Sequence, residues 1–203
     1  MTIFSSTQLK KCVALVGILF LLAESHIALA DEMTQELERF VKAYKVAESG
    51  EISLRISIQI VTNESKVNGA FVECIKSKLT PSVYEDAALD VARQQFENLD
   101  NLKTINAFLE SAVGKKLTDQ ALAWHASNLK RILDGLKPLP PHATQYTAEE
   151  WRDIQAWEKT PAYSDFISFI KNGLRNLESH DKARKSFLQL RNQCTNKPAV
   201  PIQ

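Results

Sequence analysis

Histidine is a common zinc ligand, and three of the four histidines, His125, His142 and His180, lie outside the first thirty residues. A zinc site needs three or four convergent nitrogen, sulfur or oxygen ligands, and local ligand pairs usually stand three or four residues apart. None of these histidines has a second ligand at that spacing. The sequence therefore predicts no metal site, and we expect His125, next to Trp124 on a largely apolar segment, to be structural.

Glu149, Glu150 and Asp153 could supply paired carboxylates for general acid–base catalysis. They also follow Thr147 in a pattern typical of a capping box, and acidic side chains in a first helical turn favourably oppose the helix dipole. We interpret them as capping residues. The chain has no Gly-rich phosphate loop, nucleophile elbow or Cys–His arrangement. The sequence thus predicts no catalytic residue and no cofactor, with an enzyme of dispersed site as an alternative.

The first thirty residues have the pattern of a signal peptide. Lys10 and Lys11 precede the apolar run CVALVGILFLLA, and small residues at 28 and 30 fit cleavage after Ala30. Twelve apolar residues are too few for a spanning helix, which needs about twenty. We expect residues 1–30 to be removed and the protein to reach the periplasm or the exterior, with an uncleaved anchor as the alternative.

Two cysteines, Cys74 and Cys194, lie outside this leader. An even pair in an exported chain is typical of a disulfide, because the compartments outside the cytoplasm are oxidising. We predict a Cys74–Cys194 bond, with two buried free thiols as the alternative.

The charge of the exported part is balanced. Lys10, Lys11 and Glu24 account for three of the 25 basic and 24 acidic residues, so the formal charge of the remainder is zero. Nucleic-acid binding would require a positive excess that neutralises phosphates. We therefore expect no nucleic-acid partner.

The apolar residues of the first half follow mostly helical spacing. A helix is predicted from Asp31 to Ser49 with Gly50 as its end, and another opening at Thr80-Pro81 and running towards Leu99. Residues 52–61 instead alternate strictly, which is the period of a strand. Because no second strand of comparable quality is present to pair with it, we favour a helix there, and the strand remains an alternative.

The second half divides into two candidate units, residues 98–135 and 146–180, joined by the proline-rich linker 136–145. In the first unit a helix is expected near Asp100, and a longer one from Ser111 to Asp134, ended by Gly135. In the second, Thr160 and Pro161 are expected to open a helix, and two groups of apolar residues are expected to be buried. These groups are Trp151, Ile154 and Trp157, and Phe166, Ile167, Ile170, Leu174 and Leu177.

The segments INAFLESAVGKKL (105–117) and IQAWEKTPAYSDF (154–166) lie 49 positions apart and match in residue type. Each has the pattern of a short helix, a hydroxyl cap and a longer helix, an αα-hairpin. Few of the aligned residues are identical, so duplication and a chance likeness of two amphipathic pairs both stay open. The candidate motif positions are Phe108, Ser111, Gly114, Trp157, Thr160 and Pro161.

The second segment, extended at its start to YTAEEWRDIQAWEKTPAYSDF (146–166), resembles the signature of an exported bacterial all-helical family, domain of unknown function 2059. Tyr146-Thr147, Glu149-Glu150, Trp157 and Thr160-Pro161-Ala162 match it, and Tyr163 stands where the family has glycine. The first segment keeps that glycine as Gly114 but has Ala112 in place of proline. The resemblance implies export and an all-α fold, and it implies no activity because the family has none assigned.

We therefore expect an all-α domain over residues 31–194, built from packed amphipathic helices, and a mobile tail at 195–203. The predicted function is a non-catalytic exported protein that binds a protein partner in the bacterial envelope. A carrier of an apolar ligand or lipid is the alternative from a different class. The basic segment 182–191 (KARKSFLQLR) suggests peripheral membrane contact, although a C-terminal helix docked on the core is the simpler interpretation.

Overall fold

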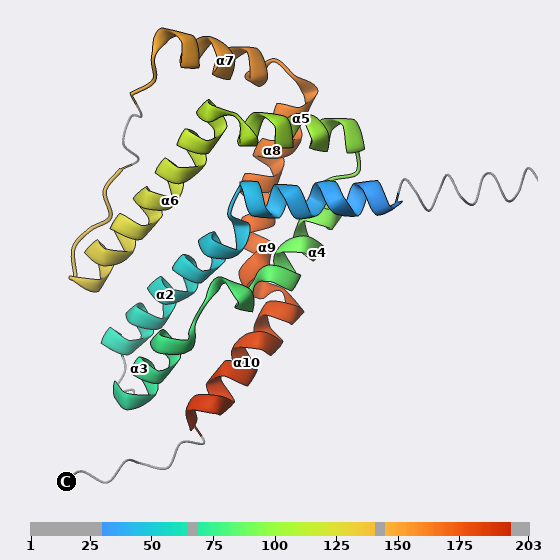
Figure 1. The fold of residues 1–203 in the computed structure, drawn as a ribbon. Helices are drawn as coiled ribbons and strands as arrows, with labels where there is room; N and C mark the ends of the chain where they lie inside the picture. Colours follow the sequence, from blue (N-terminus) through green and yellow to red (C-terminus); the bar gives the residue numbers. More distant parts are fainter. Residues whose placement is uncertain (1–29, 65–68, 141–144, 196–203) are drawn as a thin grey trace, which may run out of the picture. The chain divides into compact units, whose positions relative to one another are not determined.

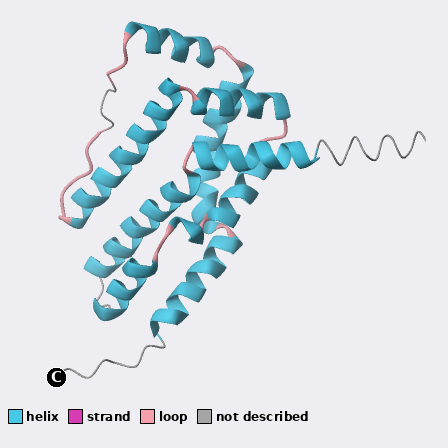
Figure 2. Ribbon diagram, viewed as in Figure 1, coloured by secondary structure: helices cyan, strands magenta, loops and turns pink. Residues whose placement is uncertain are grey.

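The computed structural model describes residues 30–64, 69–140 and 145–195, and every regular element within these ranges is a helix (Figures 1 and 2). The all-α prediction is confirmed. The predicted leader, except Ala30, and the predicted tail, except Thr195, lie outside the described residues, as do linker residues 141–144. None of the described helices has the length and apolar content needed to cross a bilayer.

Residues 30–43 are helical and precede a series of labelled elements. In chain order these are α2 (Val46–Glu64), α3 (Gly69–Lys78), the 3₁₀ turn η1 (Pro81–Val83), α4 (Glu85–Gln95), α5 (Leu99–Glu110), α6 (Ala112–Leu133), α7 (Ala148–Glu158), α8 (Pro161–Ser168), the π-helical turn η2 (Phe169–Gly173), α9 (Leu174–Ser179) and α10 (Asp181–Thr195).

The first predicted helix end is wrong. The break falls at Lys45, whose backbone has a positive φ of 55°, whereas Gly50 lies inside α2. A Cβ at Gly50 would lie 2.8 Å from both Leu177 Cδ2 and Tyr84 Cγ. This glycine therefore lets α2 approach its neighbours closely, and it does not end a helix. Because α2 includes residues 52–61, the helical interpretation of the alternating segment is correct.

The Thr80-Pro81 signal opens a shorter element than expected. Pro81 begins the single turn η1, and a separate helix, α4, starts at Glu85 and ends at Gln95. Tyr84, which is buried, is the junction between the two. The proline pattern thus located a helical start, but the prediction of one continuous helix from there towards Leu99 is wrong.

α8, η2 and α9 follow one another without a break in helical backbone, and the π turn changes which side chains face inward. Phe166 and Leu177 are buried as expected, but Ile167, Ile170 and Leu174 are only half-buried. Phe169 is fully buried in their place. A π turn inserts an extra residue into the helical repeat, so the buried stripe of a regular helix does not continue through it.

An aromatic cluster occupies the middle of the fold. The ring of Phe40 contacts the rings of Phe96 and Phe169 edge-on, at centroid distances of 4.7 and 4.8 Å. Tyr44 extends the cluster to Phe166, with ring centroids 5.1 Å apart, and burial raises the pKa of Tyr44 to about 12. These rings bring together the segment 40–44, Phe96 at the end of α4, and the elements α8 and η2.

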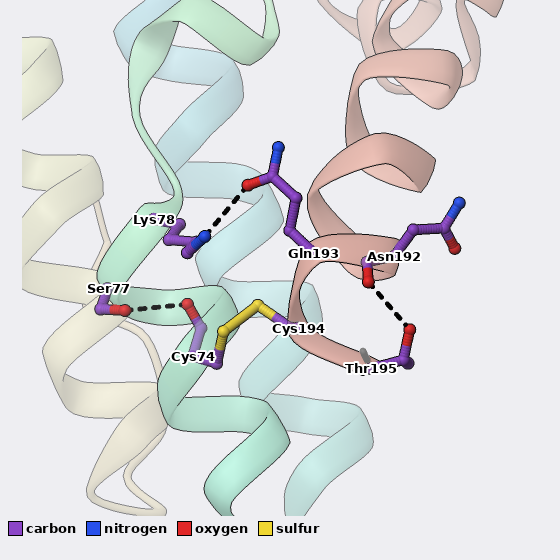
Figure 3. The surroundings of a disulfide bond; sticks show 7 residues. All are labelled: Cys74, Ser77, Lys78, Asn192, Gln193, Cys194 and Thr195. Atoms are coloured by element: carbon purple, nitrogen blue, oxygen red, sulfur yellow. Dashed lines mark hydrogen bonds between the residues drawn. A yellow bond between two sulfur atoms is a disulfide. The ribbon is translucent and has the colours of Figure 1, made fainter. Parts of the chain in front are cut away.

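A second cluster surrounds a disulfide between α3 and α10. Cys74 and Cys194 are bonded with their Cα atoms 5.7 Å apart, which confirms the predicted pair (Figure 3). Cys194 packs with Ile75, Leu79 and Leu190. Figure 1 shows α10 running beside α3, and the bond joins these helices through cysteines that are 120 residues apart in sequence.

Candidate functional site

Two helical corners lie against each other in the second half of the chain. The first is α5 turning into α6 at Ser111, and the second is α7 turning into α8 at Thr160. We call them together the paired corner. α5 packs against α8, and α6 packs against α7, so each corner contacts the other through both of its helices.

The hydroxyl at each corner makes the same two hydrogen bonds. Ser111 Oγ donates to the carbonyl oxygen of Phe108 (2.6 Å) and accepts from the Gly114 amide (3.0 Å). Thr160 Oγ1 donates to the carbonyl oxygen of Trp157 (2.7 Å) and accepts from the Tyr163 amide (3.3 Å). Both hydroxyls are therefore N-caps, already engaged by the backbone, which makes them poor nucleophiles.

The helices that lead into the corners also start alike. Asn98 caps α5 by accepting from the Asn101 amide, and Thr147 caps α7 by accepting from the Glu150 amide. Every pair of corresponding positions in these contacts is separated by 49 residues. The likeness noted in the sequence therefore extends to the hydrogen bonds of four helix ends.

The aromatic side chains at corresponding positions stack on each other. The rings of Phe108 and Trp157 have centroids 3.7 Å apart and planes inclined by 5°. Trp157 is 6% exposed and also contacts Tyr163 and Phe166, which connects the stack to the aromatic cluster in the middle of the fold. Among the described residues, its buried indole nitrogen has no hydrogen-bond partner.

Two polar contacts link the corners reciprocally. Asn101 Nδ2 on α5 donates to Asp165 Oδ2 on α8 at 2.7 Å. Lys116 Nζ on α6 donates to both carboxylate oxygens of Glu150 on α7, at 2.9 and 2.8 Å. Position 150 corresponds to 101 and position 165 to 116, so each link repeats the other with its two partners exchanged between the corners. This reciprocity is what an approximate two-fold relation would produce.

The corners differ at two pairs of corresponding positions, Ala112 and Pro161, and Gly114 and Tyr163. A Cβ at Gly114 would collide with the carbonyl oxygen of Phe108, so only glycine fits the first corner without movement. Tyr163 occupies the corresponding position of the second corner, which begins its helix with Pro161. The first corner is thus the tighter of the two.

The carboxylate of Glu150 is engaged in both a capping box and an ion pair. It accepts from Lys116 and from the Thr147 amide (2.7 Å), which completes a capping box. The hydrogen bond from Lys116, followed by the one from Thr147, lowers the pKa of Glu150 below its ordinary value. Lys116 also donates to the Gln145 carbonyl oxygen (3.0 Å). Glu149 and Asp153 are exposed.

Trp151 departs from its predicted burial. Its side chain is 47% exposed on α7, whereas Ile154 and Trp157 on the same helix are buried. The ring of Tyr146 meets it edge-on with centroids 5.2 Å apart, and Lys116 Nζ lies over the Tyr146 ring, 5.2 Å from its centroid. We call Tyr146 and Trp151 the α7 aromatic patch. Helical periodicity predicted Trp151 on the inner face of the helix, so the sequence analysis did not predict an exposed aromatic patch here.

The linker is held along α6 by hydrogen bonds on its described side. Asn128 Oδ1 accepts from the Leu139 amide (2.8 Å), and Trp124 Nε1 donates to the carbonyl oxygen of Pro140 (3.1 Å). Gly135, with φ of 71°, ends α6 as expected. Its neighbour Leu136 is 51% exposed.

The histidines and carboxylates are dispersed among different elements. Partial burial lowers the pKa of His125, which packs edge-on against Trp124 at 4.9 Å. His180 caps α9, 3.9 Å from Asp90, and His142 lies outside the described residues. Within the described ranges no group of three or more histidine, cysteine or acidic side chains could hold a metal ion.

Three of the depressions on the described surface have volumes of about 350, 420 and 440 Å³. Four carboxylates line the first, and neutral polar side chains with Lys78 or Lys171 line much of the other two. None of the three has the enclosed apolar lining that a carrier of an apolar ligand would use.

Compared with protein-family models, curated proteins and solved structures, the chain matches none. The resemblance to domain of unknown function 2059 therefore stays a prediction from the residues that carry it.

Proposed function

We propose that this protein is a non-catalytic, exported α-helical protein that binds a partner protein in the bacterial envelope through the α7 aromatic patch. Export rests on the signal-peptide pattern of residues 1–30 and fits the Cys74–Cys194 disulfide, which is typical of oxidising compartments. The family resemblance and the location in the periplasm or exterior belong to the same proposal.

The exposure of Trp151 is the observation that carries the binding role. Tryptophan and tyrosine are enriched among the few residues that dominate interface energies, because a large ring supplies much apolar contact area and a polar group. Trp151 is exposed although an exposed indole lowers solubility, and the ring of Tyr146 contacts it edge-on. α7 is held by the buried side chains of Ile154 and Trp157 and by the link from Lys116 to Glu150, and its other side chains are exposed. Its outer face is thus available along most of the helix.

We also propose that residues 98–135 and 146–180 are two copies of one αα-hairpin unit. The matched caps at Ser111 and Thr160, the Phe108–Trp157 stack and the exchanged polar links support this origin. In this protein the contacts between the two corners would fix the position of α7 and of the α7 aromatic patch. The observations favour neither the carrier nor the dispersed enzyme as a second function.

Site-specific photo-crosslinking in the native bacterium tests the proposal. A photoreactive phenylalanine analogue is placed at position 151, and in a control strain at position 130, where Lys130 is exposed on α6. We expect one protein adduct from position 151 and none of the same mass from position 130. Equal adducts from both positions, or none from either, would count against a binding role for this face.

A further inference from the structure

The outward face of α10 has a composition that its packing does not explain. Ala183, Leu190 and Cys194 are buried against the rest of the fold. On the other side of the helix, Arg184, Lys185, Leu188 and Arg191 are all exposed, with Leu188 at 45%. Leu188 follows the first two basic residues by four and three positions and precedes the third by three, so all four share one face.

The three cations of this face have no carboxylate partner among the described residues. The fourth basic residue of the helix, Lys182, differs from them because its Nζ pairs with Asp90 Oδ2 at 2.6 Å. Asp181, in the first turn, is the one acidic residue that α10 contains. The outer face of α10 therefore carries an uncompensated positive charge around an exposed apolar side chain.

α10 is fixed near both of its ends. Lys182 ties the first turn to α4 through Asp90, and the Cys194 disulfide ties the last turn to α3. Lys78 on α3 also donates to Gln193 Oε1 at 3.1 Å, beside the disulfide (Figure 3). Because the helix is already ordered and oriented, a ligand of its outer face would not have to order it.

We propose that the outer face of α10, formed by Arg184, Lys185, Leu188 and Arg191, docks on a bilayer surface rich in anionic phospholipid. The three cations would face the lipid phosphates, and Leu188 would enter the boundary between head groups and acyl chains. An acidic protein would match the charge equally well. A bilayer is favoured because Leu188 is a single apolar side chain, too little for the apolar core of a protein interface.

Co-sedimentation with vesicles tests this proposal independently of the α7 aromatic patch. The purified full chain is mixed with vesicles of phosphatidylcholine alone or of phosphatidylcholine and phosphatidylglycerol in equal parts. We expect binding to the anionic vesicles only, weakened by raising the salt concentration because added ions screen the charges. The triple variant Arg184→Gln, Lys185→Gln, Arg191→Gln should bind roughly 100-fold more weakly, since each basic residue near an anionic bilayer contributes about a fivefold factor.

Two further variants distinguish binding through the outer face of α10 from attraction by the overall charge of the protein. Lys115→Gln, Lys130→Gln, Lys137→Gln removes the same charge from exposed positions on α6 and beyond it, and should leave binding within roughly twofold of wild type. Leu188→Ala keeps the charge and should weaken binding roughly fivefold. All variants are prepared alike, so a retained leader would contribute equally, and unfolding transitions verify that each is folded.

The proposal is overturned if the wild-type protein fails to sediment with anionic vesicles or sediments equally with neutral ones. It is also overturned if the two triple variants lose the same affinity, because charge alone would then explain the binding. Capture of an acidic protein by the α10 face without vesicle binding would assign the face to a protein partner instead.

Discussion

Phe108 and Trp157 stack face to face, with ring centroids 3.7 Å apart. Each stands three residues before the hydroxyl that caps its corner, and each gives that hydroxyl its carbonyl acceptor. The two corners therefore meet through side chains at corresponding positions. The stability of the second half of the fold should depend on this pair more than on any surface contact between the corners.

The stack should be measurable by a double-mutant cycle. Trp157→Ala removes a buried indole and should reduce the free energy of unfolding by about 3 to 5 kcal/mol, and Phe108→Ala, at a half-buried position, by about 1 to 3 kcal/mol. The double variant should lose less than the sum, by about 1 kcal/mol, because the ring–ring contact is lost only once. Denaturant unfolding of wild type, the two single variants and the double variant measures this coupling energy, and strictly additive losses would contradict a stabilising stack.

The two hydroxyl caps should be energetically equivalent. Ser111→Ala and Thr160→Ala each remove an acceptor for a backbone amide at a helix start, which should cost about 1 kcal/mol in the free energy of unfolding. Ser127, exposed in the interior of α6, gives the control, and Ser127→Ala should be neutral or slightly stabilising. If one cap variant behaved like the control, the equivalence of the two corners would fail.

The link between Lys116 and Glu150 should give a defined pH dependence. The pKa of Glu150 is lowered in the folded state, so its contribution to stability is fully present above the ordinary value of 4.5. That contribution is lost as the pH falls through the lowered folded-state pKa. The stability difference between wild type and Glu150→Gln should therefore be largest near neutral pH and shrink below pH 4.5.

Glu149→Gln is the matched control for this pH dependence, because Glu149 lies one position earlier and is exposed. Its difference from wild type should be small across the same pH range. A Glu150→Gln difference that stayed constant down to the acid transition would show that the carboxylate charge does not contribute.

Two glycines should respond oppositely to the same substitution. Gly50→Ala places a Cβ 2.8 Å from Leu177 and Tyr84, and should cost about 1 to 3 kcal/mol although alanine is the better helix former. Gly69→Ala meets no atom within 4 Å at the start of α3, and should be neutral or stabilising by up to about 1 kcal/mol. Thermal unfolding of both variants compares them, and a stabilised Gly50→Ala would contradict the close approach of α2 to its neighbours.

Local signals in the sequence located the helix ends that depend on local chemistry. Ser111, Thr147 and Thr160 cap helices by contacts within three residues, and Gly135 needs only its own backbone conformation. The residues that cause each of these helix ends therefore lie within the sequence pattern that predicts it. Gly50 looked like such a signal, but its reason lies in Leu177, far along the chain. A helix end and a close contact both favour glycine, and sequence alone does not separate them.

Most contacts between residues far apart in the chain could not be predicted from the sequence, for a similar reason. The disulfide was predictable because only two cysteines lie outside the leader, whereas no pattern in the sequence pairs Asn101 with Asp165, 64 residues away. Trp151 was expected inside because helical periodicity places it with Ile154, yet its side chain is 47% exposed. The residue that carries the functional proposal is therefore among those that the periodicity misplaced.

The affinity of the purified protein for the partner captured at position 151 tests the binding role of the α7 aromatic patch most directly. Isothermal titration compares wild type with Trp151→Ala and with Leu136→Ala, which truncates a similarly exposed side chain outside the patch. We predict that Trp151→Ala weakens binding at least roughly 30-fold, as expected for an aromatic residue that dominates an interface, and that Leu136→Ala leaves it within roughly twofold. Equal affinities of Trp151→Ala and wild type would contradict the proposal.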